Sequence, residues 1–245
     1  MKFVGLLLAV LAPPAAPPPD ISIERLDDSA FRIDLTPVGT ASIAALQAQL
    51  FPSARLACQA RKPVFGRYRL AGGSLQQELI CADAVTGPDP EAATQDPQWA
   101  PTAADQRALL AVSYAYFAAK DAARYADAYG FLSERMKASA PPAEWQAGAR
   151  DFNEAAGRAL GRRVVEISWY ANPADAPEPG LYVAADYSAE FETLEFVCGY
   201  VMWKLLPDGR FALVREEQNL ARRRGAKPMA EIDRKPLRAR LGCKD

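Results

Sequence analysis

The sequence predicts an α+β protein in which three helices pack on a curled four-stranded antiparallel sheet, preceded by a small α+β unit. Two observations carry this prediction. Apolar and polar residues alternate in a run of segments between residues 163 and 214, as half-buried strands do. Apolar stripes with helical spacing precede them between residues 102 and 160. Half of the 245 residues are hydrophobic, so material for a substantial core is present.

The four strands of the predicted sheet follow one another directly in the chain. They span residues 163–170, 181–191, 196–205 and 211–214. The third is apolar on both faces, which is typical of a central strand covered on both sides. Pro207-Asp208-Gly209 favours a tight turn before the fourth strand. We therefore expect an antiparallel meander.

Three amphipathic helices are expected before this sheet. The first begins at Thr102, with Asp105 in its first turn, where the helix dipole favours an acidic side chain. The second begins again at Asp121. The pair Pro141-Pro142 ends it and starts the third helix, because proline is tolerated in a first turn. Together with the sheet they define an expected domain over residues 102–220.

The preceding segment, residues 20–84, predicts the small α+β unit. Its expected elements are strands at 21–26, 31–35, 55–60, 65–70 and 75–82 and a helix at 43–50. Pro52 is expected to end that helix. Residues 85–101 have the proline-rich, polar composition of a linker, with Trp99 expected to anchor its end on a neighbour.

Both ends of the chain carry distinct composition. Residues 1–19 read as a secretory signal and a proline-rich spacer: Lys2 is followed by an apolar run over 3–12. The run is shorter than the roughly 20 residues that span a bilayer, and a retained N-terminal anchor is the alternative. We expect a periplasmic or secreted protein without an integral membrane segment after signal removal.

Four cysteines occur, and an oxidising compartment permits disulfides. Three pairings are possible. We prefer Cys58 with Cys81, which joins two segments of the small unit, and Cys198 with Cys243, which ties the tail to the central strand. A metal site is poorly supported, because no C-x-x-C pair and no histidine is available to complete it.

Basic residues gather in two places. The tail, residues 221–245, carries nine Lys or Arg against three Asp or Glu, and we expect it to dock on its own acidic domain near residues such as Glu195. Binding of an anionic partner is the alternative. The tail has no aromatic residue to stack on bases, and no nucleic-acid partner is expected. The run from Arg61 to Arg69 is a solvated strand face or, as an alternative, an anion site.

An ordered set of residues supports a resemblance over about residues 103–219. The set is Tyr116-Phe117, Tyr125-Ala126-Asp127-Ala128-Tyr129, Leu132-Ser133, Glu144-Trp145, Arg150, Gly157, Arg163, Pro179-Gly180-Leu181-Tyr182-Val183, Tyr187, Phe191, Glu195, Val197 and Trp203. In this order it resembles the bacterial family catalogued as domain of unknown function 4019. The resemblance implies an exported protein of unassigned activity. The order of elements looks like the cone-shaped fold of the nuclear-transport-factor-2-like superfamily, which includes isomerases, dehydratases and binding modules.

A cone fold would place a pocket between the concave sheet face and the helices. The candidates to line it, or else to be ordinary core, are Tyr114, Trp145, Arg150, Trp169, Tyr187 and Trp203. We expect them to serve an envelope module that binds a protein or a small apolar ligand without catalysis, cofactor or metal.

The amino-acid composition restricts the catalytic chemistry open to this chain. The chain has no histidine, so the commonest general base and the usual partner of a nucleophilic serine or cysteine are missing. Phosphate-loop and serine-hydrolase motifs are absent as well. The alternative function is an enzyme of the isomerase or dehydratase kind. Asp186 would be its base and Tyr182 its hydrogen-bond donor, on one face of a strand.

Overall fold

The computed structural model describes residues 19–82, 86–223, 225 and 229–244. The predicted signal and spacer therefore lie outside the described residues, apart from Pro19. Within the described ranges, no helix is long and apolar enough to cross a membrane.

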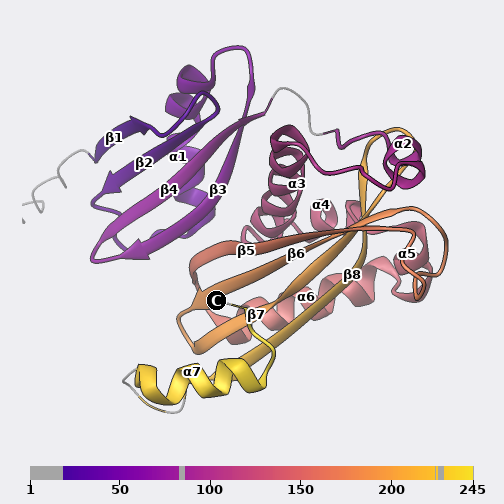
Figure 1. The fold of residues 1–245 in the computed structure, drawn as a ribbon. Coiled ribbons are helices and arrows are strands. Elements are labelled where there is room, and N and C mark those ends of the chain that lie inside the picture. The colour runs from indigo at the N-terminus through magenta and orange to yellow at the C-terminus, as the bar shows by residue number, and fades with distance from the viewer. Residues whose placement is uncertain (1–18, 83–85, 224, 226–228, 245) are drawn as a thin grey trace, which may run out of the picture.

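One antiparallel sheet of eight strands runs through the described chain (Figure 1), in the order β1-β2-β4-β3-β5-β6-β7-β8. Its strands are β1 (Asp20–Arg25), β2 (Ala30–Thr36), β3 (Lys62–Ala71), β4 (Ser74–Ala82), β5 (Ala159–Ala171), β6 (Leu181–Phe191), β7 (Leu194–Leu205) and β8 (Phe211–Arg222). The prediction of a four-stranded sheet behind a separate small unit is wrong. Alternation in the sequence locates strands but does not show that β3 pairs with the distant β5.

The described residues form seven helices, whereas we expected three before the sheet and one in the N-terminal unit. They are α1 (Ile43–Cys58), α2 (Pro90–Gln95), α3 (Ala103–Asp121), α4 (Tyr125–Gly130), α5 (Glu134–Ser139), α6 (Pro142–Ala156) and α7 (Glu231–Arg240). The second predicted helix is divided into α4 and α5. Between them, the amide of Ser133 donates to the carbonyl of Leu213, and the amide of Leu213 donates to the carbonyl of Phe131. Pairing with β8 thus replaces helical hydrogen bonds.

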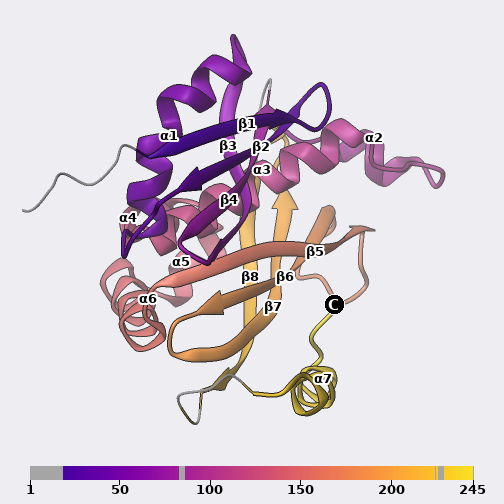
Figure 2. The same cartoon turned by 90° about the vertical axis from the view of Figure 1, so that its left-hand side faces the viewer.

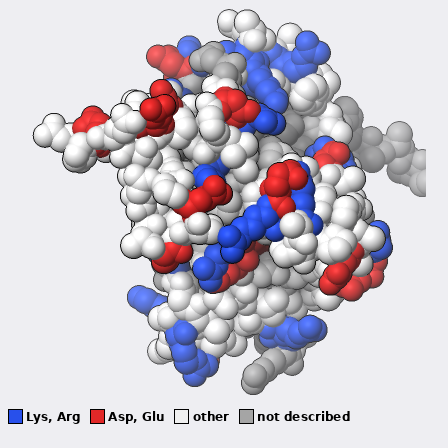
Figure 3. All heavy atoms as spheres, turned by 90° about the vertical axis from the view of Figure 1, so that its right-hand side faces the viewer, with Lys and Arg blue, Asp and Glu red and all other residues white. Residues whose placement is uncertain are grey.

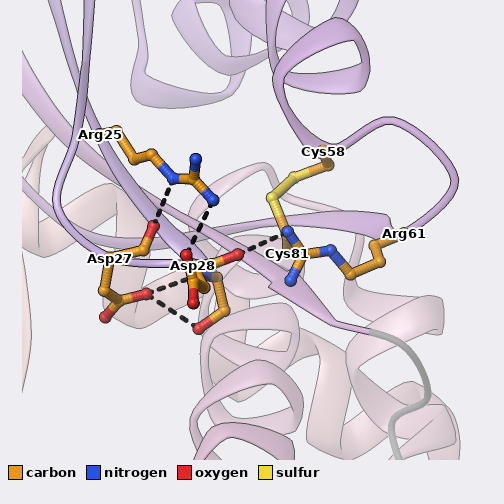
Figure 4. Close-up of a disulfide and its surroundings, with 7 residues drawn as sticks. Arg25, Asp27, Asp28, Cys58, Arg61 and Cys81 are labelled. Atoms are coloured by element: carbon orange, nitrogen blue, oxygen red, sulfur yellow. Dashed lines mark hydrogen bonds and ion pairs between the residues drawn. A yellow bond between two sulfur atoms is a disulfide. The ribbon is translucent and has the colours of Figure 1, made fainter.

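Helix α1 continues beyond Pro52, where we expected it to end. Residues 55–58, expected to begin a strand, form its last turn. The reason is the apolar stripe, which continues to the buried residues Ala54 and Cys58. A disulfide joins Cys58 to Cys81 of β4 and confirms the predicted pair. Figure 4 shows this disulfide beside Arg61, whose guanidinium donates to the carbonyl of Asp28 at 2.7 Å.

The two faces of the sheet differ in their cover. Helices α1, α3 and α6 lie on one face, and α7 lies on the opposite face (Figure 2). A continuous core fills the space beneath the first group, and α3 contributes seven of its nine buried residues to it. Trp99 packs edge-on against Trp169 with ring centroids 5.6 Å apart, which confirms the expected anchor of the linker.

Helix α3 carries polar groups into this core, and each finds a partner. The Trp203 indole donates to the Ser113 hydroxyl at 3.0 Å. The Glu216 carboxylate accepts from Lys120 at 2.8 Å and from the Tyr116 hydroxyl at 2.6 Å. Burial alone would raise the pKa of the Glu216 carboxyl, but Lys120 and these hydrogen bonds hold it below its usual value.

The seam of the sheet is the place where β3 meets β5. Only two residue pairs join these strands, Tyr68 with Arg162 and Arg69 with Gly161. On the helix side of the seam, the Arg162 guanidinium forms a bidentate ion pair with Asp121 of α3, with distances of 2.7 and 3.2 Å. The Tyr68 hydroxyl also donates to Asp121, at 3.0 Å. This buried cluster, the seam clasp, ties both halves of the sheet to α3.

Aromatic rings enclose the clasp. The Arg162 guanidinium lies 4.5 Å from the centroid of Phe117 and 5.6 Å from those of Tyr187 and Phe191. Burial by itself would lower the pKa of Arg162, but the Asp121 carboxylate raises it above its ordinary value. Burial, and then Asp121, raises the pKa of Tyr68, which keeps its hydroxyl a donor. The Arg162 guanidinium therefore stays charged and the Tyr68 hydroxyl stays protonated at neutral pH.

Replacing Asp121 with asparagine should destabilise the protein strongly. The substitution leaves the Arg162 guanidinium buried without its counter-charge, which costs roughly 3–5 kcal/mol of unfolding free energy. Urea denaturation followed by circular dichroism measures the loss. The matched control is Asp127→Asn, which breaks an exposed ion pair with Arg124 and should cost less than about 1 kcal/mol. Equal losses in the two variants would contradict a structural role for the clasp.

Candidate functional site

Three of the six predicted pocket residues lie in the main core. Tyr114, Tyr187 and Trp203 are buried between α3 and the sheet. The Tyr114 hydroxyl accepts a hydrogen bond from the amide of Val164 at 3.0 Å, where β5 diverges from β3. Burial raises the pKa values of both tyrosines well above the ordinary value. Their rings pack against Tyr116 and Phe117 of α3, and none of the three lines either cavity described below.

The other three predicted residues lie apart from one another. Trp145 of α6 is half-buried, with its ring 5.7 Å from that of Tyr129. Trp169 is half-buried against Trp99, and its indole nitrogen has no partner in the described chain. Arg150 is exposed, with its guanidinium 5.8 Å from the ring of Tyr125. The structure does not gather the six residues around one space.

A large groove instead lies on the sheet face opposite the helix layer, and we call it the outer groove. Its volume is about 1290 Å³. The floor consists of outward-facing side chains from β5, β6 and β7: Tyr170, Tyr182, Tyr200 and Met202. These positions alternate with core residues because neighbouring side chains of a strand point to opposite faces. The sequence showed the alternation, but the polar face of these strands did not suggest a binding surface.

Two loops raise the rim of the outer groove. The first joins α4 to α5, and the second joins β5 to β6. The second is closed by Asn172, whose amide donates to the carbonyl of Gly180 at 2.9 Å and whose side chain accepts from the Gly180 amide. Figure 3 views the molecule from the side of α5 and shows acidic and basic side chains interspersed across it. Four acidic and six basic side chains line the groove, so neither sign of charge dominates its lining.

Lys204 and Tyr182 connect the floor of the outer groove to the second loop. The Lys204 ammonium pairs with the Glu178 carboxylate at 2.8 Å. The Tyr182 hydroxyl donates to the Glu178 carbonyl at 2.9 Å, and burial raises its pKa. This loop is thus fixed over one end of the tyrosine floor.

The tail closes the other end of the outer groove. A disulfide joins Cys243 to Cys198 of β7, which confirms the second predicted pair. Arg234 of α7 pairs with the buried Glu195 at 2.7 Å, so the tail docks on its own acidic residues as expected. These contacts place Lys244 in the lining of the groove. Apart from the cysteine pairing, no sequence pattern predicted this position of Lys244.

Asp186 and Tyr182, the residues of the alternative enzyme reading, both line the outer groove. The Asp186 carboxylate, however, accepts from the Lys244 ammonium at 2.9 Å, and Glu166 shares the same ammonium at 2.9 Å. Hydrogen bonds to Glu166 and Asp186 raise the pKa of Lys244, and the bond from Lys244 lowers that of Glu166. Asp186 is thus an ion-paired carboxylate, and Tyr182 already donates its proton to a carbonyl.

The described residues offer no candidate metal site. Among the described residues, no group of three or more His, Cys, Asp or Glu side chains is placed to hold an ion. All four cysteines are in disulfides.

Residues 112–215 match a family described as "Protein of unknown function (DUF4019)". This segment, less than half of the chain, is similar to that family. The match confirms the predicted family and extends from within α3 into β8, so it includes most of the groove floor and the core beneath it. Strands β1 to β4 and the tail lie outside the matched residues.

The remaining comparisons gave no relatives. No curated protein and no solved structure matched the chain. The cone-shaped fold therefore stays a prediction, and the family description assigns no activity.

Releasing the tail should both destabilise the protein and open one end of the groove. Replacing Cys198 and Cys243 with serine removes the link across 45 residues, which should lower the unfolding free energy by about 4 kcal/mol. Urea denaturation measures that loss. Trypsin should cleave the tail of the variant much faster than that of the wild type.

The Cys58→Ser, Cys81→Ser double variant is the control for this experiment. It removes the disulfide between α1 and β4 and should leave the tail as resistant to trypsin as in the wild type. Equal tail cleavage in all three proteins would contradict a disulfide-held tail.

Proposed function

We propose that the protein is an exported, non-catalytic binding module whose ligand lies in the outer groove with an apolar face against the tyrosine floor. The groove itself is the observation that carries the proposal. Its volume of about 1290 Å³ exceeds the range of about 300–1,000 Å³ typical of small-molecule pockets. The ligand class is an apolar-faced molecule or segment larger than a common metabolite.

The chemistry of the floor supports binding. Tyrosine offers a wide apolar ring and a polar end, and it is enriched where proteins bind partners. Tyr170, Tyr200 and Met202 are partly exposed although they are large. Lys204, Arg210 and Arg215 stand beside them in the lining and offer hydrogen bonds at the edge of such a ligand.

The same groove argues against the enzyme alternative. A general base in a desolvated pocket needs a free carboxylate within reach of substrate. Asp186 is engaged by Lys244, whose position the tail disulfide fixes. The sequence also has no histidine, the commonest general base. A binding role makes no use of such a group.

Two observations support export to the periplasm or beyond. Both disulfides require an oxidising compartment to persist in most organisms. The N-terminal pattern of a basic residue and a short apolar run is typical of a secretory signal.

Binding of the neutral apolar dye N-phenyl-1-naphthylamine tests the proposal. The dye should bind the full chain saturably, with a rise in fluorescence. Tyr200→Ala removes the central ring of the floor and should weaken binding about tenfold, equivalent to roughly 1.4 kcal/mol. Fluorescence titration gives the dissociation constants.

The control variant is Leu56→Ala, which removes an exposed apolar side chain of α1, 80% exposed and far from the groove. It should bind the dye as the wild type does. Non-saturable binding by the wild type, or equal affinities for Tyr200→Ala and wild type, would overturn the proposed groove function.

A further inference from the structure

A second hollow lies at the seam on the same sheet face, and it shares no lining residue with the outer groove. Its volume is about 560 Å³, within the usual range of small-ligand sites. Tyr68 and Arg162 point from the seam toward α3, so their strand neighbours point into this seam hollow. The hollow is therefore the outer side of the seam clasp.

Arginine side chains from three strands surround the seam hollow. They are Arg32 of β2, Arg67 and Arg69 of β3, and Arg163 of β5. Arg67 and Arg163 directly adjoin the paired residues Tyr68 and Arg162 on their strands. Pairing of two distant strands thus brings together charges that are far apart in the chain.

Only part of this positive charge is matched. Arg32 pairs with Glu24 and Asp34, and Arg67 pairs with Glu78 at 3.4 Å. Arg69 and Arg163 have no carboxylate within ion-pair distance in the described part of the chain.

The lining of the seam hollow offers less unmatched negative charge than positive charge. Glu190 is the one carboxylate of the lining that has no ion pair within the described ranges. The seam hollow therefore has two unmatched guanidinium groups against one unmatched carboxylate.

Gly161 keeps the space between these groups open. A Cβ atom at this position would lie 3.4 Å from the carbonyl oxygen of Tyr68 and 3.8 Å from the Cβ of Glu190. Both are tolerable contacts, and the glycine does not have a positive φ. Neither backbone strain nor a steric clash therefore requires glycine here, and its effect is to leave the floor of the hollow empty.

We propose that the seam hollow is a binding site for a phosphate group, held by Arg69 and Arg163 above Gly161. The planar guanidinium fork matches phosphate oxygens in a bidentate arrangement, and its hydrogen bonds are charge-assisted. The hollow is larger than a phosphate ion, so the group belongs to a phosphate monoester with room for its organic part. This site is independent of the proposed function of the outer groove.

Calorimetric titration of the full chain at low ionic strength tests the site. The probes are inorganic phosphate, glycerol 3-phosphate and vesicles of phosphatidylcholine with phosphatidic acid. We expect saturable binding of glycerol 3-phosphate, tighter than that of inorganic phosphate. Binding to the vesicles but not to glycerol 3-phosphate would assign the phosphate to a lipid surface instead of a free ester.

Four variants connect binding to the named residues. Arg163→Gln and Arg69→Gln should each weaken binding of glycerol 3-phosphate at least tenfold. Glu190→Gln removes the opposing carboxylate and should tighten it several-fold. The control Arg55→Gln removes an exposed positive charge of α1 and should leave affinity unchanged.

Three results would overturn the phosphate site. They are absence of binding at millimolar concentrations of every probe, equal weakening by Arg55→Gln and Arg163→Gln, and no tightening by Glu190→Gln. Circular dichroism confirms that each variant is folded. The groove proposal is judged with a neutral dye and other residues, so either proposal can fail alone.

Discussion

The buried ion pair between Arg162 and Asp121 is the interaction on which the arrangement of this protein depends. The eight strands form one sheet, although only two residue pairs connect β3 with β5. A junction with so few backbone hydrogen bonds needs support from side chains. Asp121 supplies it by accepting from Arg162 on one strand and from Tyr68 on the other, while α3 holds the carboxylate in place.

The clasp also explains where binding surfaces remain. Helices α1, α3 and α6 occupy one face and bury its aromatic residues, including Tyr187 and Trp203. These rings fill the space between the helices and the sheet, so that face has no room for the pocket expected of a cone fold. The opposite face keeps its tyrosines and arginines accessible, and α7 covers only part of it. Both cavities lie there, and the seam hollow exists because the strands meet over so short a length.

Sequence patterns located the elements better than their connections. Alternation identified the strands β5 to β8, and the cysteine positions led to both disulfides. The pairing of Tyr68 with Arg162 left no local signal, since it joins residues far apart in the chain. Pro52 misled the prediction because the burial of Ala54 outweighs the cost of proline in α1. We expected the aromatic residues to line a pocket because they are large and hydrophobic. The same property places Tyr187 and Trp203 in the core instead.

The two disulfides have a mechanical consequence. Cys58–Cys81 lies within the N-terminal half of the sheet, and Cys198–Cys243 lies within the C-terminal half. Neither crosses the seam, so no disulfide holds β3 to β5, and the contact between these strands depends on non-covalent bonds. The junction between β3 and β5 can therefore separate under force without breaking a disulfide. Its rupture force is then set by one buried ion pair, one tyrosine hydroxyl and a short ladder of backbone hydrogen bonds.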